Sequence, residues 1–161
     1  MRSAARALAP THGPAALLDA LDHFAGSTLE ASFVTAAVAV IDPARRTLRY
    51  CLAGHLSPLL REPDGTVTTL GEARGAVLGF GAGDRPERMV TFGPGSMLVL
   101  FTDGLVERRG EIIDTGLARI GAALKTATPA DPVDLCDALI EQSLPHNGRN
   151  DDTAILCALL A

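Results

Sequence analysis

The stretch MLVLFTDG, residues 97–104, joins an apolar run to an aspartate and a glycine. The unbroken apolar run predicts a buried strand, and Asp103-Gly104 directly after it is typical of a turn. Near the end of the chain, DDTAILCALL at residues 151–160 has the opposite order, with two aspartates before a nearly all-apolar strand at 153–160. We expect this last strand to be central in a sheet, because both of its faces are apolar.

Together the two segments predict a metal site. If their strands are antiparallel neighbours, Asp103 follows one strand and Asp151 and Asp152 precede the other, so all three carboxylates lie at the same end of the sheet. Converging carboxylates repel one another unless a cation neutralises them, and hard oxygen donors suit Mg²⁺ or Mn²⁺. Each signal alone is weak, since Asp-Gly is more often a plain turn. The prediction therefore depends on their pairing.

The rest of the chain reads as helices, then a run of strands, then helices and one last strand. Such grouping indicates an α+β fold, with antiparallel strands packed against helices in a single domain over 1–161. Apolar residues at helical spacing predict the helices, and we expect Gly26 to end the second one. Runs of β-branched and apolar residues between turn residues predict the strands. We expect helices at 1–9, 14–24, 115–124 and 133–144, strands at 33–41, 47–52, 57–61, 66–70, 87–92, 97–101 and 153–160, and a loop at 71–85.

Composition excludes several classes of function. The 161 residues are 47% hydrophobic, enough for a core, and carry a net charge of −5 without a Lys/Arg cluster, which argues against binding to nucleic acid or an anionic membrane. The longest apolar runs, of about nine residues, are too short to span a bilayer. Three cysteines, Cys51, Cys136 and Cys157, lie far apart in apolar stretches, which indicates core residues in a reducing compartment and no zinc site. We expect a cytoplasmic protein.

His55 is a further candidate, in the turn Ala53-Gly54-His55 between two strands. A lone histidine in a turn is more often a hydrogen-bonding loop residue than a metal ligand, so it counts as a supporting residue only. The glycines of 71–85 form no phosphate-binding motif, and the chain has no GxSxG nucleophile motif.

Several segments in order resemble the stage II sporulation protein E-like phosphatases, bacterial members of the metal-dependent (PPM-type) serine/threonine phosphatases. The resemblance extends over about 33–161. Its strongest parts are FTDGLVE at 101–107 and NDDTAIL at 150–156, supported by FVTA at 33–36, LRYCLAGH at 48–55, PLL at 58–60, Gly79 and FGPG at 92–95.

This resemblance implies an αββα sandwich of antiparallel sheets flanked by helices. It implies that water activated by two Mn²⁺ or Mg²⁺ ions removes phosphate from phosphoserine or phosphothreonine, so that no side chain is itself the catalyst. On the matching positions, Asp103 and Asp151 would bind metal, Asp152 would support them or act as a further ligand, and Gly104 would allow a tight backbone turn. Typical substrates are regulatory phosphoproteins such as anti-sigma-factor antagonists.

The start of the chain departs from this pattern. Family members have earlier strands and an acidic residue that bridges both metals, whereas no Asp or Glu precedes Asp19 here. We therefore expect an N-terminally truncated domain that lacks the first strands and binds one ion weakly or none. An uncovered sheet edge would favour a homodimer.

Two functions follow from the sequence. One is a metal-dependent phosphatase; the alternative is a catalytically inactive pseudophosphatase that binds a phosphoprotein or regulator. An inert structural fragment is a third interpretation, and fold alone cannot separate them.

Overall fold

The computed structural model describes residues 1–28, 33–81, 83–127, 131–143 and 152–161. The chain forms two compact units, which are described separately. The first contains residues 1–55 and 71–91, and the second contains residues 56–70 and 92–161.

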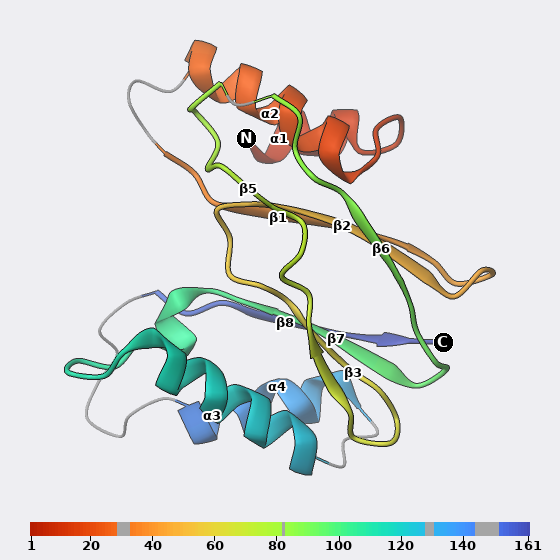
Figure 1. Cartoon of the computed structure of the whole chain (residues 1–161), viewed down its shortest axis with the longest axis vertical. Helices are drawn as coiled ribbons and strands as arrows, with labels where there is room; N and C mark the ends of the chain where they lie inside the picture. Colours follow the sequence, from red (N-terminus) through yellow and green to blue (C-terminus); the bar gives the residue numbers. More distant parts are fainter. Residues whose placement is uncertain (29–32, 82, 128–130, 144–151) are drawn as a thin grey trace. The chain divides into compact units, whose positions relative to one another are not determined.

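The first unit is a four-stranded sheet with two helices on one face (Figure 1). Strand β2 lies in its centre and pairs antiparallel with β1 along its whole length, from Thr47↔Asp42 to Ala53↔Ala36. On its other side it pairs antiparallel with β6 and parallel with β5. The elements are α1 (Arg2–Leu8), α2 (Pro14–Thr28), β1 (Ala36–Asp42), β2 (Thr47–Ala53), β5 (Arg74–Gly75) and β6 (Arg88–Thr91).

Helix α2 forms the core of this unit. Its leucines occur at helical spacing and pack on the sheet and on Leu78; the buried residues are Leu17, Leu18, Leu21, Ala25, Cys51, Ala53 and Leu78. The helix continues past Gly26 to Thr28, so the prediction that Gly26 ends it is wrong. A glycine inside a helix costs about 1 kcal/mol relative to alanine, and the neighbouring Ala25 is buried in the core of this unit.

The second unit has the same local plan, with α3 and α4 covering one face of an antiparallel sheet of order β4-β3-β7-β8 (Figure 1). Its elements are β3 (Leu59–Arg61), β4 (Val67–Thr69), β7 (Ser96–Phe101), η1 (Asp103–Leu105), α3 (Ile113–Thr126), α4 (Pro132–Ser143) and β8 (Ile155–Leu160). Alternate residues of β7, namely Met97, Val99 and Phe101, face Ile120, Leu124, Leu135 and Leu139 of the helices.

Strand β8 is not central. In the described part of the chain it pairs only with β7 and forms the edge of the sheet. Leu156 and Leu159 are 54% and 47% exposed, so the prediction from two apolar faces is wrong here. Apolar side chains on both faces of a strand do not indicate whether a neighbouring strand is hydrogen-bonded to each of its two edges.

The predicted α+β fold with antiparallel sheets is confirmed, and the hairpins form where the turn residues indicated. The predicted loop 71–85 contains the short strand β5. Arg61 of β3 stabilises the end of α3, because its guanidinium donates to the carbonyl oxygens of Leu124 (2.7 Å) and Ala127 (2.6 Å). None of the helices in the described ranges is long and apolar enough to cross a membrane.

Candidate metal site

The antiparallel pairing of β7 and β8 brings the two acidic segments to one end of the sheet, as the sequence predicted. Phe101 at the end of β7 is opposite Ile155 at the start of β8. The ladder continues one step further, since the Thr102 N–H donates to the Ala154 carbonyl at 3.0 Å. Asp103 comes directly after Thr102, and Asp152 lies two residues before Ala154.

Thr102 fastens the two segments together. Its hydroxyl accepts a hydrogen bond from the Ala154 N–H at 2.8 Å. The same hydroxyl lies 3.3 Å from the Asp152 carbonyl oxygen and 3.4 Å from that of Ala154, so it can donate to either. Thr102 was not among the predicted site residues. Its position between a buried strand and Asp103 was its one signal in the sequence.

Gly104 permits a close approach of backbone. A Cβ atom there would lie 2.6 Å from the Asp152 carbonyl oxygen and 2.8 Å from the Thr153 hydroxyl, too close for any side chain. Gly104 lies in the short 3-10 helix η1, where the backbone turns directly after β7, and its φ is not positive. A glycine is needed because the backbone of the segment Asp152-Thr153, which precedes β8, passes directly against it.

The carboxylates themselves are open to solvent. Asp103 is exposed, and its Oδ1 accepts a hydrogen bond from the Gly104 N–H at 3.0 Å. Asp152 is also exposed, while Asp151 lies outside the described residues. Within the described residues, no three His, Cys, Asp or Glu side chains gather as a metal would require. Hard carboxylate oxygens at one sheet end nevertheless fit Mn²⁺ or Mg²⁺ rather than a soft metal.

His55 is the other predicted supporting residue. It is half-buried, directly after β2 and Gly54, and belongs to the first unit, whereas Asp103 and Asp152 belong to the second. Its supporting role stays a prediction.

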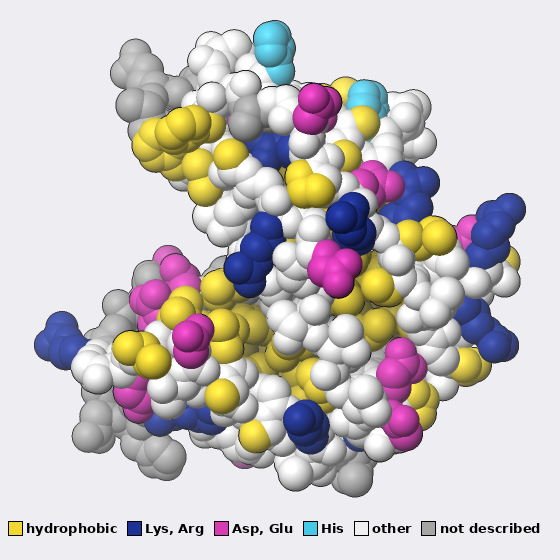
Figure 2. Space-filling model, viewed as in Figure 1, with side chains coloured by type: hydrophobic (Ala, Val, Ile, Leu, Met, Phe, Trp, Pro, Cys, Tyr) yellow, Lys and Arg dark blue, Asp and Glu magenta, His cyan; other side chains and the backbone are white. Residues whose placement is uncertain are grey.

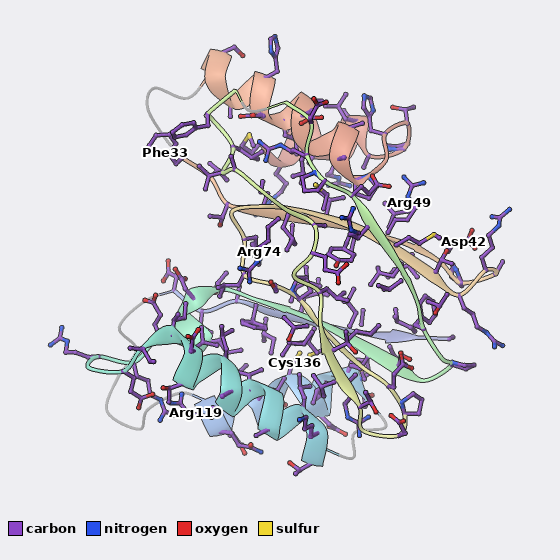
Figure 3. The ribbon with its side chains drawn as sticks, viewed as in Figure 1. Phe33, Asp42, Arg49, Arg74, Arg119 and Cys136 are labelled. Carbon is purple, nitrogen blue, oxygen red and sulfur yellow. The ribbon has the colours of Figure 1, made fainter. Side chains whose placement is uncertain are left out.

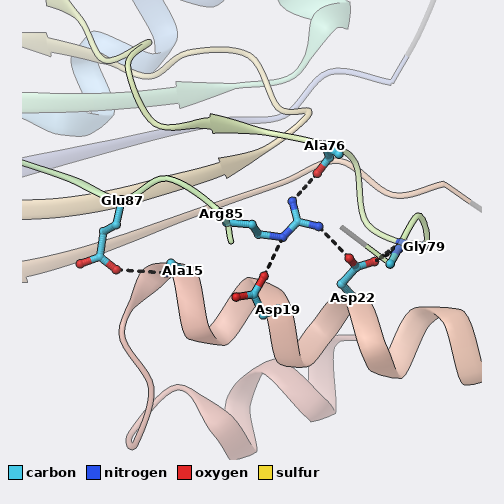
Figure 4. A network of polar contacts seen from close by, with 8 residues as sticks. Ala15, Asp19, Asp22, Ala76, Gly79, Arg85 and Glu87 are labelled. Carbon is cyan, nitrogen blue, oxygen red and sulfur yellow. Dashed lines mark hydrogen bonds and ion pairs between the residues drawn. The ribbon is translucent and has the colours of Figure 1, made fainter. Parts of the chain in front are cut away.

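The first unit contains a buried ion-pair network, which was not predicted from the sequence (Figure 4). Arg85 is 6% exposed and forms ion pairs with Asp22 (2.9 Å) and Asp19 (3.2 Å), and it donates to the Ala76 carbonyl. Asp22, 3% exposed, also accepts from the Gly79 N–H at 2.5 Å. The network binds the glycine-rich loop to α2. Asp19 and Asp22 at helical spacing beside the leucines of α2 were its only sequence signal.

Burial and hydrogen bonding oppose each other at Asp22. Burial alone would raise the pKa of its carboxyl group, but hydrogen bonds from Gly79, Arg85 and Gly81 outweigh it, so the pKa lies below the ordinary value. The charged form of Asp22 is therefore a stable part of the fold.

Two phenylalanines of the first unit form an exposed aromatic pair. Phe33 and Phe80 are 65% and 68% exposed, and their ring centroids lie 5.4 Å apart. Figure 3 labels Phe33 at the margin of the unit, and Figure 2 shows hydrophobic surface at the same place. Exposed apolar area of this kind is typical of contacts with another protein.

Comparison with known proteins identifies one family. A family model described as stage II sporulation protein E (SpoIIE) matches residues 1–160. The RsbU and RsbW domains of a Mycobacterium tuberculosis protein are 29% identical, with a TM-score of 0.87 over 97% of this chain and 44% of that chain.

Two further structures share the fold. The SiaA-PP2C domain of Pseudomonas aeruginosa is 24% identical, with a TM-score of 0.81 over 99% of this chain and 67% of that one. The manganese-presoaked phosphatase domain of Bacillus subtilis SpoIIE is 14% identical, with a TM-score of 0.69 over 99% of this chain and 70% of that one. The chain thus spans less than half of the Mycobacterium chain and about two thirds of the other two.

Proposed function

Since this chain belongs to the stage II sporulation protein E family, we propose that it acts in metal-dependent removal of phosphate from phosphoserine or phosphothreonine of a regulatory protein. The observation that carries the proposal is the antiparallel pairing of β7 and β8, which puts Asp103 and Asp152 at the same end of one sheet. The PP2C phosphatase domains of similar fold support it.

We assign the metal to Asp103, Asp151 and Asp152, with Mn²⁺ or Mg²⁺ as the ion. When bound, such an ion neutralises phosphate charge and lowers the pKa of water toward neutrality. The chain's own residues hold the ligands in place: Thr102 fixes the backbone beside Asp152, and Gly104 leaves room for it. Exposed carboxylates suit a substrate that is a folded protein, because a phosphorylated side chain can reach them without entering a deep cavity.

The partner is proposed to be a phosphorylated regulator such as an anti-sigma-factor antagonist, in the cytoplasm. Support comes from the Mycobacterium relative, whose structure combines an RsbU with an RsbW domain. The negative net charge of −5 gives no reason to expect nucleic acid or a membrane as partner.

Manganese-dependent hydrolysis tests the phosphatase proposal. The purified chain is incubated with p-nitrophenyl phosphate and with a phosphoserine peptide, in millimolar Mn²⁺ or in EDTA. We expect turnover that EDTA abolishes and added Mn²⁺ restores, because the carboxylates cannot act on phosphate without the cation. Hydrolysis that is indifferent to EDTA would contradict the assignment.

A second candidate is a protein-binding module without hydrolysis. The exposed Phe33–Phe80 pair favours it, since it provides a contact surface that needs no metal. Binding of the phosphoprotein with no release of phosphate, in either Mn²⁺ or EDTA, would select this function over the first.

We also propose that the chain forms a homodimer through the edge of β8. The exposed Leu156 and Leu159 lie on this strand, and among the described residues no strand pairs with its outer edge, which makes that edge a template for pairing with a second copy. Sedimentation at micromolar concentration should give twice the monomer mass, and Leu159→Lys should shift the chain to monomer. A monomer in both samples would exclude the dimer.

A further inference from the structure

Helix α3 packs directly on the backbone of the turn that follows Asp103. Gly116, near the start of α3, is buried, and a Cβ atom there would overlap the Val106 carbonyl oxygen. The same Cβ would lie 2.7 Å from the Val106 carbonyl carbon and 2.9 Å from its Cα, which is closer than van der Waals contact. The atoms in the way belong to the backbone, so no side chain can rotate to make room. This arrangement therefore requires glycine at position 116.

The contact is connected to Asp103 by a single hydrogen-bonded turn. The N–H groups of Val106 and Glu107 both donate to the Asp103 carbonyl oxygen at 2.8 Å, and the Leu105 N–H donates to the Thr102 carbonyl at 3.1 Å. Leu105 and Val106 are each 1% exposed and belong to the core cluster that α3 also contributes to. The turn has little slack, so a displacement of Val106 would also move Asp103.

We propose that Gly116 is a positioning residue for the metal site, because it lets α3 support the η1 turn and so sets where the Asp103 carboxylate lies relative to Asp152. The inference rests on the proposed function, since it concerns the same metal site. Two glycines would then serve one turn. Gly104 lets the backbone of Asp152 approach it, and Gly116 lets α3 approach it.

Helix α3 is held more firmly than the turn that it supports. Ile120 and Leu124 of the helix are fully buried in the core. Arg61 donates to carbonyl oxygens at the end of the helix, and Arg119 forms an ion pair with Glu111, just before its start. The η1 turn is a three-residue 3-10 helix, a conformation with poorer hydrogen-bond geometry. We therefore expect a methyl group added to the glycine to displace the turn rather than the helix.

Gly121 provides a matched control on the same helix. A Cβ atom at this position would meet no atom within 4 Å in the described part of the chain. Alanine favours a helix more than glycine does, so Gly121→Ala should raise the melting temperature by a few degrees. Gly116→Ala makes the same chemical change and should not give this gain, because the new methyl group collides with Val106.

Amide spectra of the metal-free chain test the coupling itself. In Gly116→Ala we expect the nuclear magnetic resonance signals of the Asp103, Gly104 and Thr153 amides to shift, whereas in Gly121→Ala they should stay in place. The proposal is overturned if the shifts in Gly116→Ala are confined to α3 and Val106, since the displacement would then not reach the carboxylates.

A manganese titration measures whether the ligands themselves are displaced. The wild type and both variants are titrated well below their melting temperatures, so that every sample is folded. We expect the dissociation constant for Mn²⁺ to rise by at least about 10-fold in Gly116→Ala, as for loss of a residue that orients a metal ligand, and to stay unchanged in Gly121→Ala. A glycine with a merely structural role would lower the melting temperature and leave the affinity unchanged, and that result would overturn the proposal.

The wild-type chain gives a measurement that remains valid even if Gly116→Ala does not fold. Coupling between sites is reciprocal, so Mg²⁺ bound at Asp103 should shift the amide signals of Val106 and Gly116 as well as that of Gly104. A response at Gly104 without one at Val106 and Gly116 would rule out the positioning role. No response at Gly104 would instead contradict the proposed metal site, and the metal-free spectra would still decide whether Gly116 positions the turn.

Discussion

Replacement of Arg85 by methionine should lower the free energy of unfolding by about 3–5 kcal/mol, because it leaves the Asp22 carboxylate buried without its cation. Asp22 is 3% exposed and Arg85 is 6% exposed, so water cannot replace the lost partner. Methionine keeps much of the apolar stem, which confines the change to charge and hydrogen bonding. Urea unfolding at neutral pH measures the loss.

Arg88→Met is the matched control. Arg88 pairs with Glu72 at 3.7 Å, and the two side chains are 52% and 82% exposed. Exposed ion pairs contribute little, so the unfolding free energy should change by less than about 0.5 kcal/mol. Equal losses in the two variants would show that burial of the Arg85 network is unimportant for stability.

The pH dependence of the Arg85→Met effect follows from Asp22. In the folded protein the pKa of this carboxyl lies below its ordinary value of 3.8. Asp22 therefore contributes stability that is present above that value and is lost as the pH falls through the folded pKa. The variant loses the arginine that helps to lower the pKa, and a protonated Asp22 needs no cation. The deficit of the variant should thus shrink below about pH 4; a constant deficit would point to lost packing instead.

The sequence predicted those parts of the fold that depend on neighbours along the chain. Helix α3 was expected at 115–124 and spans Ile113–Thr126, because its apolar residues recur at helical spacing. The hairpin of β1 and β2 was recognisable from the turn at Asp42-Pro43. Strand β5 was missed because it has two residues, and its pairing with β2 is set by tertiary contacts rather than by local composition.

The candidate site was likewise predictable only where it depends on neighbours along the chain. Asp103 and Asp152 could be located because each adjoins an apolar strand, and the pairing of β7 with β8 confirmed their common sheet end. The close approach of Gly104 to Asp152 could not be predicted, because it depends on how two segments distant in the sequence pack together. The same holds for Arg85, because its partners Asp19 and Asp22 lie on a helix far away in the sequence.

Asp103→Asn should reduce manganese-dependent phosphatase activity by more than about 100-fold. Loss of a residue that only supports a metal ligand costs about 10–100-fold, and loss of a ligand should cost more. Asparagine keeps the side-chain oxygen that accepts the Gly104 N–H, so the local fold should survive and the melting temperature should stay unchanged. Initial rates at saturating Mn²⁺ and a manganese titration measure the two components separately.

Asp114→Asn is the control for the loss of one negative charge. Asp114 is exposed in the first turn of α3, in the same unit as Asp103, and asparagine there should leave the rate and the manganese affinity unchanged. Because manganese affinity can be titrated on its own, the comparison is decisive even for a chain that turns over slowly. If Asp103→Asn binds Mn²⁺ as tightly as the wild type does, Asp103 is not a ligand. If affinity falls only in that variant while phosphopeptide binding persists, Asp103 holds the metal and does not contact the substrate.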